Sequence, residues 1–142
     1  MPKTSLLTDD TNIAQLRDLI PLIGTLGIEL VSAGSEQVVA RLKWAPELCT
    51  AGGLLHGGVL MALADTTGGI CAYLNLPDGA TATATIESKT NFLRAITEGG
   101  VTASSSPLHR GRQLAVIETE LTQDDGRLAA KVTQTQIFRF TA

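Results

Sequence analysis

Aromatic side chains are scarce in this 142-residue sequence, at 4% of residues, whereas apolar residues together make up 44%. The core must therefore be aliphatic, and it can be sizeable without disulfides or a metal. The two cysteines, Cys49 and Cys71, are too few for a disulfide framework. Neither has an evident companion histidine and acid, and lone cysteines are often merely buried, so a catalytic cysteine is disfavoured. No His/Cys cluster has metal-ligand spacing, so we expect no metal.

A basic excess is also missing. The net charge of −3 gives no electrostatic footprint for nucleic acid, which we exclude as the main partner. No run of about 18 or more apolar residues is present, so we expect no membrane span. The first residues lack a charged segment followed by a long apolar one, and we therefore expect no secretory signal and a cytoplasmic location. The length fits a single domain over residues 1–142.

Periodicity predicts a helix, two strands, a long helix and then strands only. An N-terminal helical segment is expected over about residues 10–26, capped by Asp10, Thr11 or Asn12 and ended or bent by Pro21. The longest nearly uncharged stretch, Gly57 to Leu74, predicts a helix of about 27 Å that is apolar on nearly every face. Six strands are expected, at residues 27–32, 37–44, 80–93, 101–108, 114–123 and 128–140.

One buried helix surrounded by a six-stranded antiparallel sheet is an α+β arrangement. Such a sheet has open edges, and a single copy covers one side of the helix poorly. Unpaired strand edges and an exposed apolar helix face both favour association with another chain. Pairing through the helix and an edge strand solves both, so we expect a homo-oligomer. The pair Gly68-Gly69 is then interpreted as allowing close helix packing at the seam of the dimer.

Asp65 is the only acid in the long helix. Burying an unpaired carboxylate costs on the order of several kcal/mol of stability. Helix propensity also gives no reason for an aspartate in the middle of a helix. A residue that breaks two rules at once is a candidate functional residue.

The start of the same helix is bare of acids. His56, Gly57 and Gly58 lie where the first backbone N–H groups have no intrahelical partner. The positive end of the helix dipole is therefore free for an anion, and glycine lets a ligand approach the backbone closely. These are the requirements of an oxyanion hole for a carbonyl that becomes tetrahedral.

Gly57 and Asp65 are eight residues apart, which is about 12 Å along a helix axis. A carbonyl carbon must lie about 3 Å from both the attacking group and the oxyanion donor, so one helix cannot supply both. Two antiparallel copies of the helix side by side can. The chemistry therefore predicts a dimer in which Gly57 of one subunit faces Asp65 of the other.

The pattern Gly53-x-x-His56-Gly57-Gly58, with Asp65 seven residues later, resembles that of a known family. It is similar to the PaaI-like branch of the 4-hydroxybenzoyl-CoA thioesterase superfamily, whose members are hot-dog-fold acyl-CoA thioesterases. The resemblance covers about residues 20–140. Two further motifs support it, Phe92-Leu93-Arg94 after a strand and Gly111-Arg112 before another.

The resemblance implies a hot-dog fold, in which a six-stranded antiparallel sheet wraps around a long central helix and an N-terminal helix precedes it. It also implies hydrolysis of acyl-CoA or aryl-CoA thioesters to the free acid and CoA. No separate cofactor is expected, since CoA is part of the substrate. The oligomer is expected to be a dimer or a dimer of dimers, that is, a homotetramer. The acyl group, and CoA as against a carrier-protein thioester, stay open.

Roles for individual residues follow from the resemblance. Asp65 takes the position of the nucleophile or general base, and the N–H of Gly57 that of the oxyanion donor. His56 corresponds to a histidine that holds the loop and the carbonyl site. Thr85 matches a strand hydroxyl that positions the attacking water. Relatives often carry asparagine where this chain has Thr50, a departure that bears on substrate choice or rate.

Phosphates of a CoA ligand need cations, and the densest basic cluster is Arg110 with Arg112; Lys89 and Arg94 are further candidates. Solvated surface charge is the alternative interpretation of these arginines. The residues expected to contact substrate outside the catalytic set are Thr50, Gly58, Arg94, Arg110 and Arg112.

Structural interpretations also stand beside the catalytic ones. Asp65 can be satisfied by backbone groups or by the Thr66 hydroxyl, and His56 can bond a loop carbonyl. Gly57-Gly58 can be only a tight helix entry, and threonine is ordinary in strands, which covers Thr85. Two other functions remain open: a hot-dog hydratase or dehydratase, which needs a paired acid and base, and a non-catalytic acyl-CoA-binding domain.

Overall fold

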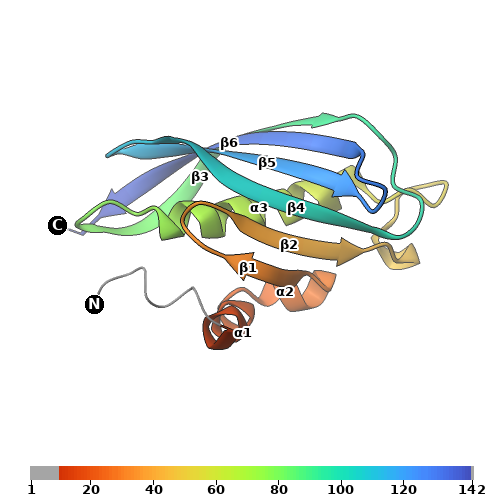
Figure 1. The fold of residues 1–142 in the computed structure, drawn as a ribbon, viewed down its shortest axis with the longest axis horizontal. Coiled ribbons are helices and arrows are strands. Elements are labelled where there is room, and N and C mark those ends of the chain that lie inside the picture. Colours follow the sequence, from red (N-terminus) through yellow and green to blue (C-terminus); the bar gives the residue numbers. More distant parts are fainter. Residues whose placement is uncertain (1–9, 142) are drawn as a thin grey trace.

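The computed structural model describes the backbone of residues 10–141 and the side chains of residues 13–141. Helices α1 (Asp10–Leu19) and α2 (Pro21–Leu26) come first, and the long helix α3 (Gly57–Leu74) lies between two groups of strands. The order and class predicted from the sequence are confirmed (Figure 1). The strands are β1 (Glu29–Ala33), β2 (Val38–Lys43), β3 (Ala80–Phe92), β4 (Gly100–Arg110), β5 (Leu114–Gln123) and β6 (Leu128–Phe140).

The six strands form one antiparallel sheet in the order β1-β2-β4-β5-β6-β3. The sheet curves around α3, which packs against β2 to β6 (Figure 1). Between β5 and β6 the chain turns at Asp124-Asp125-Gly126, where Gly126 has the positive φ of 85° that the hairpin needs. Strands β1 and β3 are the two edges of the sheet, so β3 pairs with β6 on one side only.

Pro21 divides the N-terminal segment as predicted. It has no N–H and stands at the first position of α2, so α1 ends at Leu19 and a new helix begins. Gly27 closes α2 with a φ of 72°, a left-handed conformation that suits glycine. The capping side chain expected among Asp10, Thr11 and Asn12 lies outside the described side chains.

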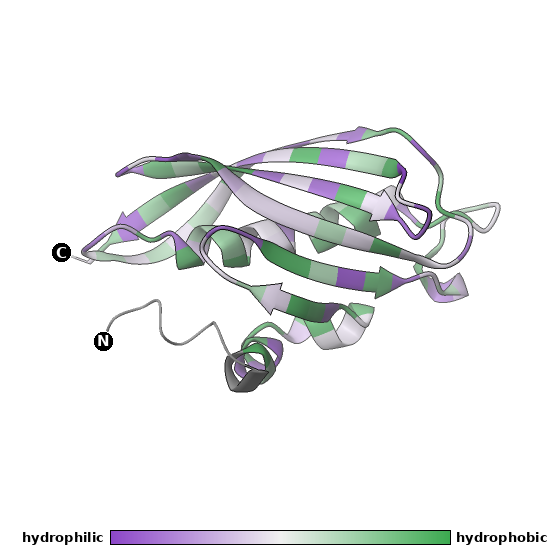
Figure 2. Cartoon of the chain, in the orientation of Figure 1, coloured by the Kyte–Doolittle hydropathy of each residue, from purple (hydrophilic) through white to green (hydrophobic). Residues whose placement is uncertain are grey.

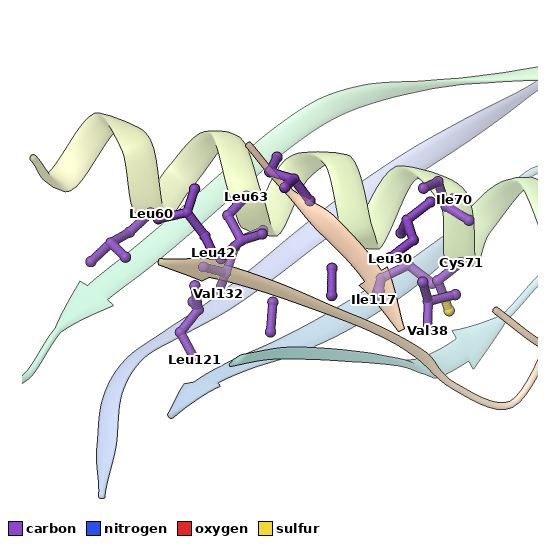
Figure 3. Close-up of a cluster of buried hydrophobic side chains, with 14 of the residues drawn as sticks. Leu30, Val38, Leu42, Leu60, Leu63, Ile70, Cys71, Ile117, Leu121 and Val132 are labelled. Atoms are coloured by element: carbon purple, nitrogen blue, oxygen red, sulfur yellow. The ribbon is translucent and has the colours of Figure 1, made fainter. Parts of the chain in front are cut away.

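The core lies between α3 and the concave face of the sheet, and its side chains are aliphatic as the composition predicts (Figure 3). Along β5 and β6 buried and more exposed residues alternate, so that one face of each strand turns to the helix, although both strands carry polar as well as apolar residues (Figure 2). Buried residues from both partners meet there, among them Leu42, Leu60, Leu63, Ile70, Cys71, Ile117, Leu121 and Val132.

One side of α3 stays uncovered in a single chain. Gly58, Met61, Asp65 and Tyr73 are exposed on it, and we call these four residues the open stripe. The composition of α3 had indicated a helix covered by protein on every face. A single copy instead leaves the side that carries Asp65 exposed. With 18 residues and a mean hydropathy of 1.2, α3 is long and apolar enough to span a membrane. The buried core helix of a globular domain meets the same two criteria, and half of α3 is buried within the described chain.

Candidate active site

Asp65 lies in the middle of α3 with one carboxylate oxygen held and one free. Its Oδ1 accepts a hydrogen bond from the Thr85 hydroxyl on β3, at 2.8 Å, and another from Nε2 of Gln134 on β6, at 3.1 Å. No partner of Oδ2 is found within residues 13–141, and Thr66 makes no hydrogen bond to the carboxylate there. The carboxylate is therefore fixed in orientation while keeping an accessible oxygen.

The Thr85 hydroxyl is itself oriented by hydrogen bonds from neighbouring side chains. Nε2 of Gln136 donates to Thr85 Oγ1 at 2.6 Å, and the Thr83 hydroxyl donates to Oε1 of Gln136 at 3.0 Å. Both Gln134 and Gln136 are fully buried, at 0% and 1% exposed. Sequence reasoning missed these two glutamines. The only signal for them was their placement two residues apart, between Val132 and Phe138, on a strand that had to turn one face to the core.

Asp65 forms part of the wall of a cavity of about 480 Å³. The cavity opens between α1, α3 and β3, and most of its wall is apolar or carries threonine hydroxyls. It is lined by Gln15, Leu16, Leu19, Ile20, Asp65, Gly69, Ile70, Tyr73, Thr81, Ala82, Thr83, Ala84, Thr85 and Gln136. Apolar walls with a few convergent polar groups are typical of small-molecule sites.

His56 caps the first turn of α3. Its Nδ1 accepts a hydrogen bond from the N–H of Gly58 at 2.8 Å, and no hydrogen bond from the ring to a loop carbonyl is found within residues 13–141. The N–H of Gly57 has no acceptor in the part of the chain that the structure describes. Since no acid lies in this first turn, the Gly57 N–H is the donor left at the positive end of the helix.

A second cavity, of about 340 Å³, lies at this end of α3. The Phe92 ring covers Gly57 so closely that a Cβ added to the glycine would stand 3.2 Å from ring carbons. Arg94 donates to the carbonyl of Leu128 at 3.2 Å. The lining residues are Thr50, Leu54, Leu55, Gly57, Leu60, Phe92, Leu93, Arg94, Ala95 and Ile96.

The structure sorts the sequence-predicted residues into two groups. Asp65 and Thr85 meet at the first cavity, whereas Thr50, Gly57 and Arg94 line the second. Within one chain these groups stay apart, which agrees with the spacing argument from the helix.

Arg110 and Arg112 belong to neither group. Arg110 forms an exposed ion pair with Glu36 at 2.6 Å, next to the turn that joins β1 to β2. Arg112 is exposed in the turn after β4, and neither arginine lines the two cavities. The alternative interpretation as surface charge therefore describes their setting in a single chain.

The cysteines offer no activated nucleophile. Burial raises the pKa of the Cys71 thiol to about 11, so this thiol stays neutral at pH 7. Cys49 is half-buried, and its thiol donates to the carbonyl of Ala45 at 3.3 Å.

Comparison with known proteins identifies the family. Residues 52–130, more than half of the chain, match the family model described as Thioesterase superfamily. The chain belongs to the Thioesterase superfamily. The matched residues run from the loop before α3 into β6, and they include His56, Gly57, Asp65 and Thr85.

Relatives of this superfamily match over most of their length. The proofreading thioesterase EntH of Cronobacter turicensis is 35% identical over 106 residues, 75% of this chain and 77% of the relative. The structure of a thioesterase from Haemophilus influenzae, at 27% identity, superposes with a TM-score of 0.84 over 95% of both chains. The Escherichia coli PaaI protein, at 21% identity, shares the fold, with a TM-score of 0.81 over 91% of both chains.

These matches confirm the hot-dog fold and the resemblance drawn from the His-Gly-Gly motif. They place the chain among the thioester hydrolases.

Proposed function

We propose that the chain hydrolyses acyl-CoA or aryl-CoA thioesters to the free acid and CoA, in a site shared by two subunits. One subunit supplies the Asp65 carboxylate and the other the N–H of Gly57. The observation that carries the proposal is the half-anchored carboxylate. Oδ2 of Asp65 accepts no hydrogen bond from the described residues and Asp65 lines an apolar cavity, on the uncovered side of a helix whose first residue, Gly57, lines a different cavity.

The chemistry can follow two routes from this geometry. In the first, Oδ2 attacks the carbonyl carbon, the C–S bond breaks, CoA leaves as a thiolate, and water then hydrolyses the acyl-enzyme anhydride. In the second, Oδ2 takes a proton from a water molecule whose oxygen attacks the same carbon; the C–S bond then breaks, the free acid forms, and CoA leaves as a thiolate that is protonated to the thiol. In both, negative charge develops on the carbonyl oxygen, and the Gly57 N–H with the helix dipole stabilises it.

Two features of the single chain support the dimer. The open stripe leaves an apolar helix side uncovered, and β3 presents an edge that no other strand of the described chain pairs. Packed helices lie about 8–10 Å apart. An antiparallel partner helix along the open stripe therefore brings its amino end toward the middle of the first, with room for a thioester carbonyl between them.

The two cavities fit the two parts of the substrate. The apolar cavity beside Asp65 is proposed to hold the acyl group. The second cavity carries Arg94 near Gly57, and we propose this arginine as a phosphate or pantetheine contact, since its guanidinium has donors beyond the one used on Leu128. Thr50 and Gly58 adjoin the same end of the helix. Arg110 and Arg112 stay candidates for the CoA phosphates, although neither lines a cavity of the single chain.

A hydratase mechanism fits the site less well. It needs an acid paired with a base, and where Asp65 serves as the acid, His56 at the helix start is the candidate base. Because Nδ1 of His56 accepts from Gly58, a neutral ring carries its proton on Nε2 and has no free lone pair for proton abstraction.

The test is a thiol-release assay over short, long and aromatic CoA thioesters. The proposal expects free CoA from at least one class, at a rate that Asp65→Asn abolishes. Hydration of an enoyl-CoA without thiol release would indicate the hydratase. Binding without turnover across the panel would indicate the non-catalytic domain.

Thr85→Val is expected to lower kcat by about ten- to a hundredfold, because the carboxylate loses one of the two donors that orient it. Valine keeps the shape and suits a strand. Steady-state kinetics and a thermal melt measure the effect. Thr135→Val is the matched control, since Thr135 lies on β6 between the two glutamines and forms no side-chain hydrogen bond in the described chain. Equal rates for both variants would contradict the role of the hydroxyl.

A further inference from the structure

Two amide side chains lie where the fold calls for apolar ones. The positions of β6 that face α3 are Val132, Gln134, Gln136 and Phe138, all of them buried. Burying an amide costs stability unless every polar atom finds a partner. A leucine or methionine would serve the core at least as well, so the amides need another reason to be there.

Gln134 meets this requirement only in part. Its Nε2 donates to Oδ1 of Asp65, but its Oε1 is buried and has no partner within the described residues. Turning the amide over would set Oε1 against the carboxylate oxygen, so that two acceptors face each other. The unpaired Oε1 is thus a consequence of holding Asp65.

The helix is shaped to admit this amide. Gly68 lies one turn after Asp65 on α3, and a Cβ built on Gly68 would overlap the Gln134 amide group. Gly68 is buried against β6 and Gly69 lines the Asp65 cavity. The interpretation of Gly68 as a packing residue at the dimer seam is therefore wrong; the missing side chain makes room for Gln134.

Gln136 acts on the second donor. A hydroxyl has one proton, and Thr85 accepts a hydrogen bond from Gln136, so its own proton is directed to Asp65. The Thr83 hydroxyl fixes the Gln136 amide in turn. Two buried amides thereby orient both donors that meet on Oδ1.

We propose that Gln134 is a positioning residue that selects which oxygen of Asp65 reacts. With Oδ1 held by Gln134 and Thr85, Oδ2 is the atom that attacks the carbonyl carbon or takes the proton of water. The role rests on the proposed function, because it concerns an oxygen of the same carboxylate. Gln134 itself touches no substrate; it acts through Asp65.

Gln134→Met tests this role, because methionine has similar length and volume but donates no hydrogen bond. The expected result is a kcat lower by about ten- to a hundredfold, with KM within about threefold of the parent, since the substrate surfaces are unchanged. The melting temperature is expected to stay or rise, because the unpaired Oε1 is gone. Thr119→Val is the matched control. It breaks the buried Ser105–Thr119 hydrogen bond of 2.6 Å elsewhere in the core and is expected to lower the melting temperature but not kcat.

A double variant separates positioning from general damage. In an Asp65→Asn background, Gln134→Met is expected to cause no further loss, because the residue works only through the carboxylate. A parental kcat in Gln134→Met, or a full additional loss in the double variant, would overturn the inference. Should Gln134→Met not fold, Gly68→Ala displaces the unchanged amide, and a parental kcat there would overturn it equally.

The proposed function has its own separate outcome. Turnover that survives Asp65→Asn contradicts the proposed function. If Asp65→Asn has no measurable turnover and Gln134→Met keeps the parental kcat, the positioning role of Gln134 is contradicted and the proposed function is not.

Discussion

Asp65→Asn is expected to lower kcat for CoA thioester hydrolysis by about a thousandfold or more. Its side-chain oxygen can still accept from Thr85 and Gln134, so the anchored half of the network stays in place. The amide NH₂ then occupies the position of Oδ2, where it can neither attack a carbonyl nor take a proton. Because only the reacting atom changes, KM and the melting temperature are expected to stay close to the parent.

Thiol release under saturating substrate measures this effect, and burst kinetics distinguish the two routes. Asp78→Asn is a suitable control, since it makes the same chemical change at an exposed turn after α3. An Asp65→Asn enzyme with a rate within tenfold of the control would contradict both roles proposed for the carboxylate.

Gly57→Pro is expected to lower kcat by about a hundred- to a thousandfold, the usual cost of removing one oxyanion donor. Proline removes the N–H and also adds side-chain carbons beside the Phe92 ring. Gly57 is the first residue of α3, a position that proline favours, and His56 before it has φ −63° and ψ 134°, which a residue preceding proline readily adopts.

Gly57→Ala is the control for bulk. Alanine keeps the N–H and adds a methyl group beside the Phe92 ring, which is about half-exposed and free to move. Its loss is expected to be several-fold at most. Equal losses in the proline and alanine variants would show that crowding, and not the hydrogen bond, governs the rate.

Local patterns were enough to place the elements. The predicted bounds of α3, β5 and β6 match the observed ones, because strong turn residues flank each of them and their apolar periods are long. Strand β3 was also placed correctly, but its two bulges, after Ala80 and after Thr85, were not foreseen. Bulges depend on the pairing with β6, which a single segment does not encode.

The glutamines of β6 show why part of the site could not be predicted. In Thr133-Gln134-Thr135-Gln136 polar residues fall on both faces of the strand, so alternation gives no inner face. Only the register with β3 and the absence of a side chain at Gly68 place Gln134 beside Asp65. These are relations between distant segments.

His56 and Asp65 show two other limits. Histidine is not a favoured N-cap residue, so capping preferences do not predict its ring on the Gly58 N–H. Composition indicated that α3 needs cover but not which side a single chain leaves open. That Asp65 lies on the open stripe follows only from how α3 packs on the sheet.

The most direct test of the shared site is a mixed dimer of Asp65→Asn and Gly57→Pro subunits, isolated through two different affinity tags. If each site takes Asp65 from one subunit and Gly57 from the other, one of the two sites in the mixed dimer is fully intact. The mixed dimer is then expected to regain about half of the parental activity, although each variant alone is nearly inactive. A mixed dimer no more active than the separate variants would contradict the account, because both groups would then have to act within one chain.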